Sequence, residues 1–205
     1  MYPKWLDWAG RLQAIAQNGL LYTQNHFDIE RYQAVRQVAA EMVAAGSTAE
    51  VERVTQLFSG EEGYATPKVD VRGVLFRDGK VLLVQEWSDG GWTLPGGWAD
   101  IGASPSENVV REIREETGFE ARAVKLLAVY DRNKHPHTPF VHHVYKMFFL
   151  CEIVGGQAAT SAETLAVAFF GRDEIPPLSV QRVTAGQIER FFEHYQHPEW
   201  PTDFD

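Results

Sequence analysis

The sequence predicts an α/β fold in which helices flank a mixed β-sheet as an α/β/α sandwich, preceded by a small all-helical segment. Three observations predict this fold. Apolar residues recur at helical spacing as far as about residue 59. After Pro67 they give way to β-rich runs with turn signals, and a capped helix lies between two groups of these runs.

The N-terminal segment, residues 1–62, is expected to contain three amphipathic helices. A second helical run ends at Gly46, as helices commonly do, and a third helix is expected over residues 48–58. The stretch SGEEGYATP that follows is typical of a linker. The repeated apolar positions of the first helix are Trp5, Trp8, Leu12 and Ile15. This stripe must cover either the second domain or another subunit, and we expect a homodimer.

The second domain, residues 67–205, begins with two β-rich runs. Asp78–Gly79 joins them and is a strong hairpin signal. A short strand around WTLPGG is interrupted by its proline and glycines. The later elements expected are a helix over residues 105–117, strands over 123–132, 142–154 and 164–170, and a closing helix over 180–195.

Composition and charge restrict the function classes. The chain is 44% hydrophobic and 23% charged, as in an ordinary globular protein. Its formal net charge of −9 disfavours nucleic acid and anionic membranes as partners, because phosphate backbones are normally met by basic surfaces. A bridging cation would still allow an acidic protein to bind a phosphate-bearing small molecule.

Compartment signals favour the cytoplasm. Cys151 is the one cysteine and lies in an apolar run, so we expect a buried thiol and no intramolecular disulfide. The N-terminal residues lack the features of a secretory signal. No stretch is apolar for the ~20 residues that would span a bilayer.

The acidic helix carries the main chemical signal. Ser104 and Glu107 form a capping box with Pro105 at the first helical position, which fixes where the helix begins. At about 100° per residue, three glutamates then share an arc of roughly 100°. They are Glu112, Glu115 and Glu116. Like charges at these spacings repel, so the pattern indicates either a divalent metal or a solvated acidic face.

A double glycine upstream of the helix favours the metal. Gly96–Gly97 allows a close backbone approach, and exposed carbonyl oxygens in such a loop are suitable ligands for Mg²⁺. The stretch GGWADIGASPSENVVREIREETGF resembles the signature box of Nudix hydrolases. The positions in register are Gly97, Arg111, Glu112, Ile113, Glu115, Glu116, Gly118 and Phe119.

The resemblance extends over roughly Pro67 to Tyr195 and implies a Nudix-like sandwich. The helical N-terminal segment, with TPKVDVRG and LPGGW, resembles the subgroup described as CDP-choline or ADP-ribose pyrophosphatases. That subgroup implies metal-dependent hydrolysis of the pyrophosphate bond in a nucleoside diphosphate linked to another moiety. The expected substrate is therefore a nucleoside diphosphate derivative.

The resemblance also implies roles for the box residues. Glu112 and Glu116 would hold Mg²⁺ or Mn²⁺, with Glu115 and the carbonyl of Gly96 completing the set. Arg111 is the arginine of the signature box and is expected to be one of the catalytic residues. The carboxylate that orients or deprotonates water is Glu112 or Glu163, which precedes the strand TLAVAFF.

One position departs from the box, because Ala103 stands where glutamate is expected. In the family that glutamate braces the loop and pairs with the box arginine. Its loss should affect rate and loop order more than metal binding. Glu107 is expected to replace the missing glutamate in part, by pairing with Arg111 four residues later. An engineered substitution is the other explanation for Ala103. The departure also supports an alternative function, a nucleotide sensor that does not cleave.

Four further residues are candidates for substrate binding. Asp70 and Arg72 share a strand face and either reach a phosphate or ribose or form an ion pair with each other. Trp92 and Trp98 flank the glycine loop and either stack on a base or belong to the core.

The stretch DRNKHPHTPFVHH contains four of the seven histidines. They are His135, His137, His142 and His143. The segment forms a transition-metal site, a loop in which Arg132 or Lys134 meets substrate phosphate, or a solvated loop without function.

Overall fold

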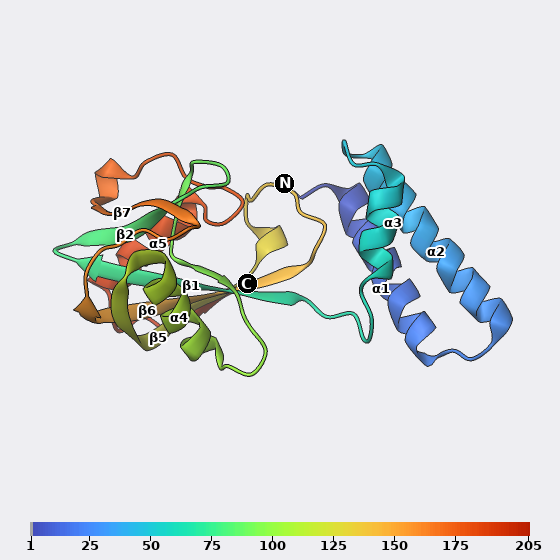
Figure 1. Ribbon diagram of the computed structural model, residues 1–205, viewed down its shortest axis with the longest axis horizontal. Helices are drawn as coiled ribbons and strands as arrows, with labels where there is room; N and C mark the ends of the chain where they lie inside the picture. The colour runs from blue at the N-terminus through green and yellow to red at the C-terminus, as the bar shows by residue number, and fades with distance from the viewer. Residues whose placement is uncertain (1) are drawn as a thin grey trace. The chain divides into compact units, whose positions relative to one another are not determined.

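In the computed structural model, which describes residues 2–205, the chain divides into two units (Figure 1). One unit runs to Pro67 and also includes Pro139–His143. The other consists of Lys68–Thr138 and Val144–Asp205. The sequence pattern did not indicate that a five-residue segment of the second domain groups with the N-terminal helices.

Three helices form the N-terminal unit, as predicted. They are α1 (Lys4–Tyr22), α2 (His26–Ala45) and α3 (Val51–Ser59). Asn25 caps α2 by accepting hydrogen bonds from two backbone N–H groups of its first turn. The core between the helices is rich in alanine and also contains Leu6, Val43, Val54 and Phe58.

The apolar stripe of α1 divides between this core and the surface. Trp5 and Leu12 pack against the core cluster. Trp8 and Ile15 are 52% and 56% exposed. The outward part of the stripe is therefore uncovered within the chain.

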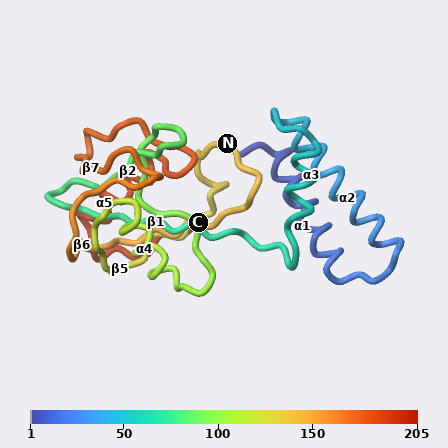
Figure 2. Tube along the Cα trace, in the orientation of Figure 1, coloured from blue at the N-terminus to red at the C-terminus, as the bar shows by residue number. Residues whose placement is uncertain are grey.

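The second unit is built on a mixed sheet of eight strands. Their order is β3-β2-β1-β6-β5-β8, with β4 paired to β1 and β7 paired to β2. The central pair, β1 and β6, is parallel although the two strands are far apart in sequence (Figure 2). The strands are β1 (Lys68–Arg77), β2 (Lys80–Glu86), β3 (Trp92–Thr93), β4 (Gly96–Trp98), β5 (Phe119–Asp131), β6 (Val144–Gly156), β7 (Thr164–Phe170) and β8 (Asp203–Phe204).

The layers are those of an α/β/α sandwich (Figure 1). On one face, α4 (Pro105–Thr117) packs Val109 and Ile113 against the sheet. On the other face, α5 (Ala185–Gln196) contributes Ile188, Phe191 and Phe192 to a second core cluster. Two short 3₁₀ helices, η1 (Arg132–Lys134) and η2 (Arg172–Glu174), complete the unit.

The turn and cap signals correspond to real boundaries. Asp78 and Gly79 have φ angles of 52° and 72° between β1 and β2, as the predicted hairpin requires. The closing helix begins at Ala185 rather than at residue 180, because Thr184 caps it. Strand β5 begins at Phe119, directly after α4, and β8 was not predicted.

Two further expectations concern burial and membranes. Cys151 is buried, and burial raises the pKa of its thiol to about 12. Across residues 2–205, none of the helices combines the length and apolar character needed for a bilayer span.

Candidate active site

The loop before α4 lies directly against two carboxylates of that helix. Gly96 has a φ of 138°, and a Cβ atom there would collide with the carbonyl oxygen of Val71. Its N–H donates a hydrogen bond to Oε2 of Glu116 over 2.8 Å. A Cβ atom on Gly97 would lie 3.1 Å from Oε2 of Glu112. The double glycine is thus what allows the backbone to reach this position.

The N-terminus of α4 is fixed by its predicted capping box. Ser104 and Glu107 exchange hydrogen bonds in both directions, with Pro105 at the first helical position. The buried Asn108 extends this anchor, since its amide donates to the carbonyl oxygens of Asp100 and Ala103. Asn108 was not predicted as a site residue, because an asparagine in a helix carries no distinctive signal.

Glu116 is buried and has an unusual proton affinity. Burial raises the pKa of its carboxyl to about 7, with Glu112 and Glu86 adding to the rise. The Arg72 guanidinium and the Gly96 N–H oppose it. Burial also raises the pKa of Glu112. Burial thus disfavours the ionised form of both carboxylates, and a bound divalent cation would favour it.

Arg111 holds the remaining acidic groups. Its guanidinium lies 2.8 Å from Asp100, 2.8 Å from Glu112 and 2.7 Å from Glu115. The expected pair between Arg111 and Glu107 is wrong. Glu107 instead accepts a hydrogen bond from the backbone N–H of Ser104 over 2.7 Å, and Asp100 supplies the loop carboxylate.

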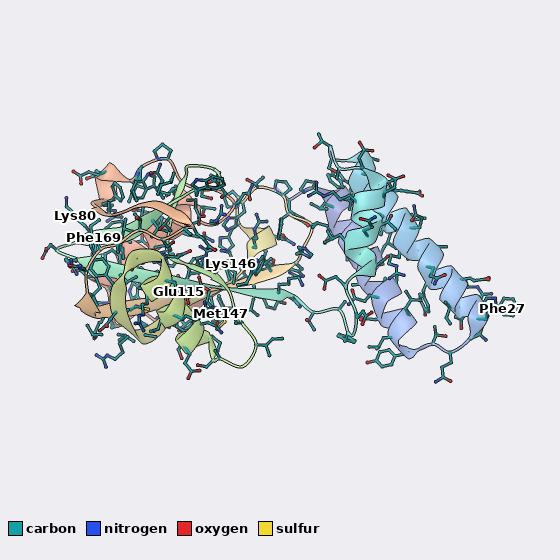
Figure 3. All side chains as sticks on the ribbon, in the orientation of Figure 1. Phe27, Lys80, Glu115, Lys146, Met147 and Phe169 are labelled. Carbon is teal, nitrogen blue, oxygen red and sulfur yellow. The ribbon has the colours of Figure 1, made fainter. Side chains whose placement is uncertain are left out.

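The donor set suits a hard divalent cation in its chemistry. Carboxylate oxygens and the Gly96 carbonyl are the ligands that Mg²⁺ and Mn²⁺ prefer. Within residues 2–205, however, no group of three or more His, Cys, Asp or Glu side chains is gathered as a metal site. Glu112 and Glu115 are instead both paired with the guanidinium of Arg111. Glu115 is labelled in Figure 3.

Asp70 and Arg72 form the ion pair that was one of the two alternatives. Two nitrogens of Arg72 donate to the two Asp70 oxygens over 3.1 and 2.8 Å. Both residues are buried, so direct contact with a substrate is not the arrangement seen. A third nitrogen of Arg72 donates to the carbonyl of Leu94 over 3.2 Å. Arg72 thereby holds the segment that leads to Gly96.

Lys146 is a buried partner of this pair that the sequence did not reveal. Its ammonium lies 2.5 Å from Oδ1 of Asp70, and the residue is 2% exposed. Burial lowers the pKa of Lys146 to about 8, while Arg72 and Lys146 together outweigh burial and lower the pKa of Asp70 to about 2. Lys146 and Met147 alternate between the faces of β6 (Figure 3). The parallel pairing of β1 with β6 places Lys146 beside Asp70.

Glu163 lies at the start of β7, exposed, beside a carboxylate that was not predicted. Its carbonyl accepts a hydrogen bond from the N–H of Trp87 over 3.1 Å. Glu86, the preceding residue, is buried and pairs with Arg182 over 2.9 Å. Burial raises the pKa of Glu86, and the charge of Glu163 adds to that rise. The positive charges of Arg182 and Arg72 oppose it. Glu86 ends an apolar strand, which gave no chemical signal in the sequence.

The other aromatic and basic candidates divide between core and loop. Trp92 packs edge-on against Phe170 beside the α5 core, as in the core alternative. Trp98 is partly exposed on β4. Arg132 is buried, and its guanidinium donates to the carbonyl oxygens of Thr138 and Gln181. Buried donors with protein acceptors do not favour a direct phosphate contact for Arg132.

The histidines do not gather into a metal site in the described residues. His135 pairs with Asp205 over 3.0 Å. His137 contacts the carbonyl of Val180 and the amide of Gln187. His142 contacts the ring of Phe140 in the segment that groups with the N-terminal unit.

Comparison with known proteins matches both units. Residues 3–58 match the family model described as a UDP-X-like, N-terminal oligomerisation domain. Residues 66–191 match the model of the NUDIX domain. A Bacillus subtilis (strain 168) protein provisionally named ADP-ribose pyrophosphatase YjhB is 47% identical, over 98% of this chain and 97% of its own length.

Two solved structures are also similar. A UDP-X diphosphatase is 35% identical, with a TM-score of 0.65 over 98% of each chain. An ADP-ribose pyrophosphatase from Streptococcus suis is 41% identical, with a TM-score of 0.63 over 68% of this chain and 100% of its own.

Proposed function

Because the chain belongs to the Nudix hydrolase family and is a pyrophosphatase of that family, we propose that it cleaves a nucleoside diphosphate linked to a second moiety. The observation that carries the proposal is the close packing of Gly96 and Gly97 against Glu116 and Glu112. This arrangement brings backbone and carboxylate oxygens together where a pyrophosphate could bind through a cation.

Nudix hydrolases generally depend on a divalent metal, and we propose Mg²⁺ or Mn²⁺ here. Glu112, Glu115, Glu116 and the Gly96 carbonyl would hold it. When bound, the cation neutralises non-bridging phosphate oxygens and stabilises the leaving phosphate. Binding of the cation would require Arg111 to release Glu112 and Glu115. Arg111 would still be paired with Asp100, which lies in the loop before α4.

The proton of the attacking water needs an acceptor that the metal does not occupy. We propose Glu163 or Glu112 for this role. Glu163 is exposed and lies on the β7 end that contacts the loop after β2, so water can reach it. Glu112 is closer to the glycine loop but is paired with Arg111.

Arg72 and Asp70 are proposed to act on the substrate through the loop that they hold. The Arg72 bond to Leu94 and the Gly73 bond to Pro95, 2.8 Å, fix the two residues before Gly96. A small displacement of this loop would move the Gly96 carbonyl away from a bound cation. Such misplacement by about 1 Å can reduce a rate a hundredfold.

The relatives suggest which substrates to test first. One relative and one solved structure are named ADP-ribose pyrophosphatases, and a second structure is named a UDP-X diphosphatase. We therefore propose ADP-ribose and UDP-linked sugars ahead of CDP-choline. Each should be incubated with Mg²⁺ or Mn²⁺ and scored by the phosphomonoesters released. Release of inorganic phosphate from nucleoside triphosphates alone would contradict the proposal.

We also propose that the protein is a homodimer formed through its N-terminal unit. Residues 3–58 match an oligomerisation domain, and α1 leaves three large apolar side chains uncovered at seven-residue spacing. They are Trp8, Ile15 and Tyr22. A seven-residue repeat keeps side chains on one helix face, which suits packing against a second copy.

A further inference from the structure

The Glu86–Gly91 turn, which joins β2 to β3, is held by an extensive set of hydrogen bonds. Within it, the N–H of Glu86 donates to the Gly91 carbonyl over 2.9 Å, and the N–H of Gly90 donates to the Glu86 carbonyl over 3.0 Å. The N–H of Gly91 donates to Oδ1 of Asp89 over 3.0 Å. The turn therefore has a defined backbone conformation.

Arg182 fixes the Glu86–Gly91 turn from outside. Its guanidinium lies 2.9 Å from Glu86, 3.4 Å from Asp89 and 3.1 Å from the hydroxyl of Ser88. Ser179 adds a hydrogen bond to Asp89 over 2.8 Å. Several side-chain contacts thus hold a six-residue turn that contains little apolar surface of its own.

Trp87 is the exception in this turn. Its backbone N–H is bonded to the Glu163 carbonyl over 3.1 Å, yet the residue is 73% exposed. Across residues 2–205, the Trp87 indole has no ring-stacking, cation–π or hydrogen-bond partner. A large aromatic in this position contributes little to the core, although its backbone is held in place.

The position of Trp87 relates it to the acidic site. Glu86, its neighbour, interacts electrostatically with Glu116 and Glu163, and Trp87 itself bonds to Glu163. The backbone of Trp87 is therefore fixed between Glu86 and the backbone of Glu163, two residues close to the acidic site, and the ring is exposed at this position. A flat aromatic surface at such a place suits a flat, apolar-faced part of the ligand.

We propose that Trp87 is the stacking residue for the nucleobase of the substrate. This inference rests on the proposed function, because it assumes a nucleoside diphosphate derivative as ligand. Every base has a π-face, so stacking on one indole provides affinity with little base selectivity. The fixed backbone of the turn reduces the ordering cost of binding.

The test compares Trp87→Ala, Trp87→Phe and Trp87→Leu with the parent, using ADP-ribose and a UDP-linked sugar. Stacking contributes about 1–3 kcal/mol per base, so Trp87→Ala should raise KM on the order of tenfold or more. Its kcat should stay within about twofold, because the base is bound equally in ground and transition states. Phe should restore most of the affinity, and Leu should not.

Two controls separate stacking from a general loss of fit. A substrate analogue whose ribose carries no base should have the same KM in the parent and in Trp87→Ala. Phe204→Ala removes an equally exposed aromatic, 79%, on β8 at the far edge of the sheet, and should leave KM unchanged. Equal KM values for the parent and Trp87→Ala on both nucleotides would overturn the inference while leaving the proposed function intact.

Binding provides a test that does not need turnover. Titration calorimetry with ADP-ribose and Ca²⁺ should show about tenfold weaker binding to Trp87→Ala than to the parent. If the parent cleaves none of the nucleotides, the proposed function fails, and the calorimetric comparison still decides the role of Trp87. Unchanged binding to Trp87→Ala would then overturn it.

Discussion

At the scale of single residues, the site depends on one buried carboxylate. Glu116 accepts a hydrogen bond from Gly96 and lies close enough to Glu112 and Glu86 for each to raise its pKa. Glutamine has the same shape and can keep the bond from Gly96, but it has no charge to hold a cation. The observed role of Glu116 in holding the loop can therefore be separated from its proposed role in holding a metal ion.

We predict that Glu116→Gln abolishes turnover and leaves the fold intact. Mg²⁺ should raise the melting temperature of the parent by mass action, and that of the variant by less. Steady-state rates and thermal melts at several Mg²⁺ concentrations measure both effects. Glu120→Gln, an exposed position on β5, should behave like the parent. Activity of Glu116→Gln within threefold of the parent would contradict the site.

The second prediction at this scale concerns Ala103. Asp100 already pairs with Arg111 from the same loop, and Asn108 ties Ala103 to α4. Restoring the family residue as Ala103→Glu should therefore change kcat modestly or not at all. Rates of both proteins on one substrate at saturating Mg²⁺ provide the measurement. A silent parent beside an active Ala103→Glu would show that the missing glutamate is essential to turnover.

At the scale of elements, local signals predicted structure better than nonlocal ones. The bounds of α4 were predicted from residues within one turn of its ends, because capping is a local interaction. The Asp78–Gly79 hairpin is local in the same sense. Lys146 was missed because its partner, Asp70, is 76 residues away and meets it only through the pairing of β1 with β6.

The sequence identified some candidate residues but did not predict how they are packed or exposed. The glycine loop and the three glutamates lie within one continuous stretch, so sequence spacing was sufficient to relate them. Whether Trp92 is exposed depends on β3 packing beside the α5 core, and sequence spacing does not report that packing. The two residues of β8 are too few for any periodic pattern.

The contact between the loop after η1 and helix α5 has a pH-dependent element. The Val180 carbonyl can only accept, so Nδ1 of His137 carries the proton in their 2.8 Å contact. The Gln187 carbonyl accepts from the Thr184 N–H, which turns its amide nitrogen toward Nε2 of His137, 3.3 Å away. His137 is therefore neutral in the folded protein, and burial lowers its pKa to about 4.

We predict that this contact loses stability as the pH falls from about 6.5 toward 4. In that window the unfolded chain binds a proton at His137 and the folded chain does not, so protonation favours unfolding. Above about 6.5 both states are neutral and the effect is absent. Urea midpoints of the parent and His137→Asn, measured from pH 7 to pH 4.5, should converge or cross as the pH falls. Parallel curves would contradict the prediction.

At the scale of the whole molecule, the exposed stripe of α1 predicts how copies associate. Trp8→Glu and Ile15→Glu would each place a charge in the proposed interface and should convert the dimer to a monomer. Sedimentation velocity at micromolar concentration measures this directly. Val38→Glu, at an exposed apolar position on α2, is the matched control and should remain dimeric. A monomeric parent would contradict the proposed assembly.

The segment Pro139–His143 has a consequence for how the chain is connected. It belongs to the N-terminal unit, where Val141 packs against the helical core and the Phe140 carbonyl accepts a hydrogen bond from Tyr2. The polypeptide therefore crosses between the units three times, once after Pro67 and once on each side of this segment. A single protease cut in the linker leaves them joined by two covalent tethers. A gene that begins at residue 68 would express a catalytic unit whose Pro139–His143 segment has lost the helices against which Val141 packs.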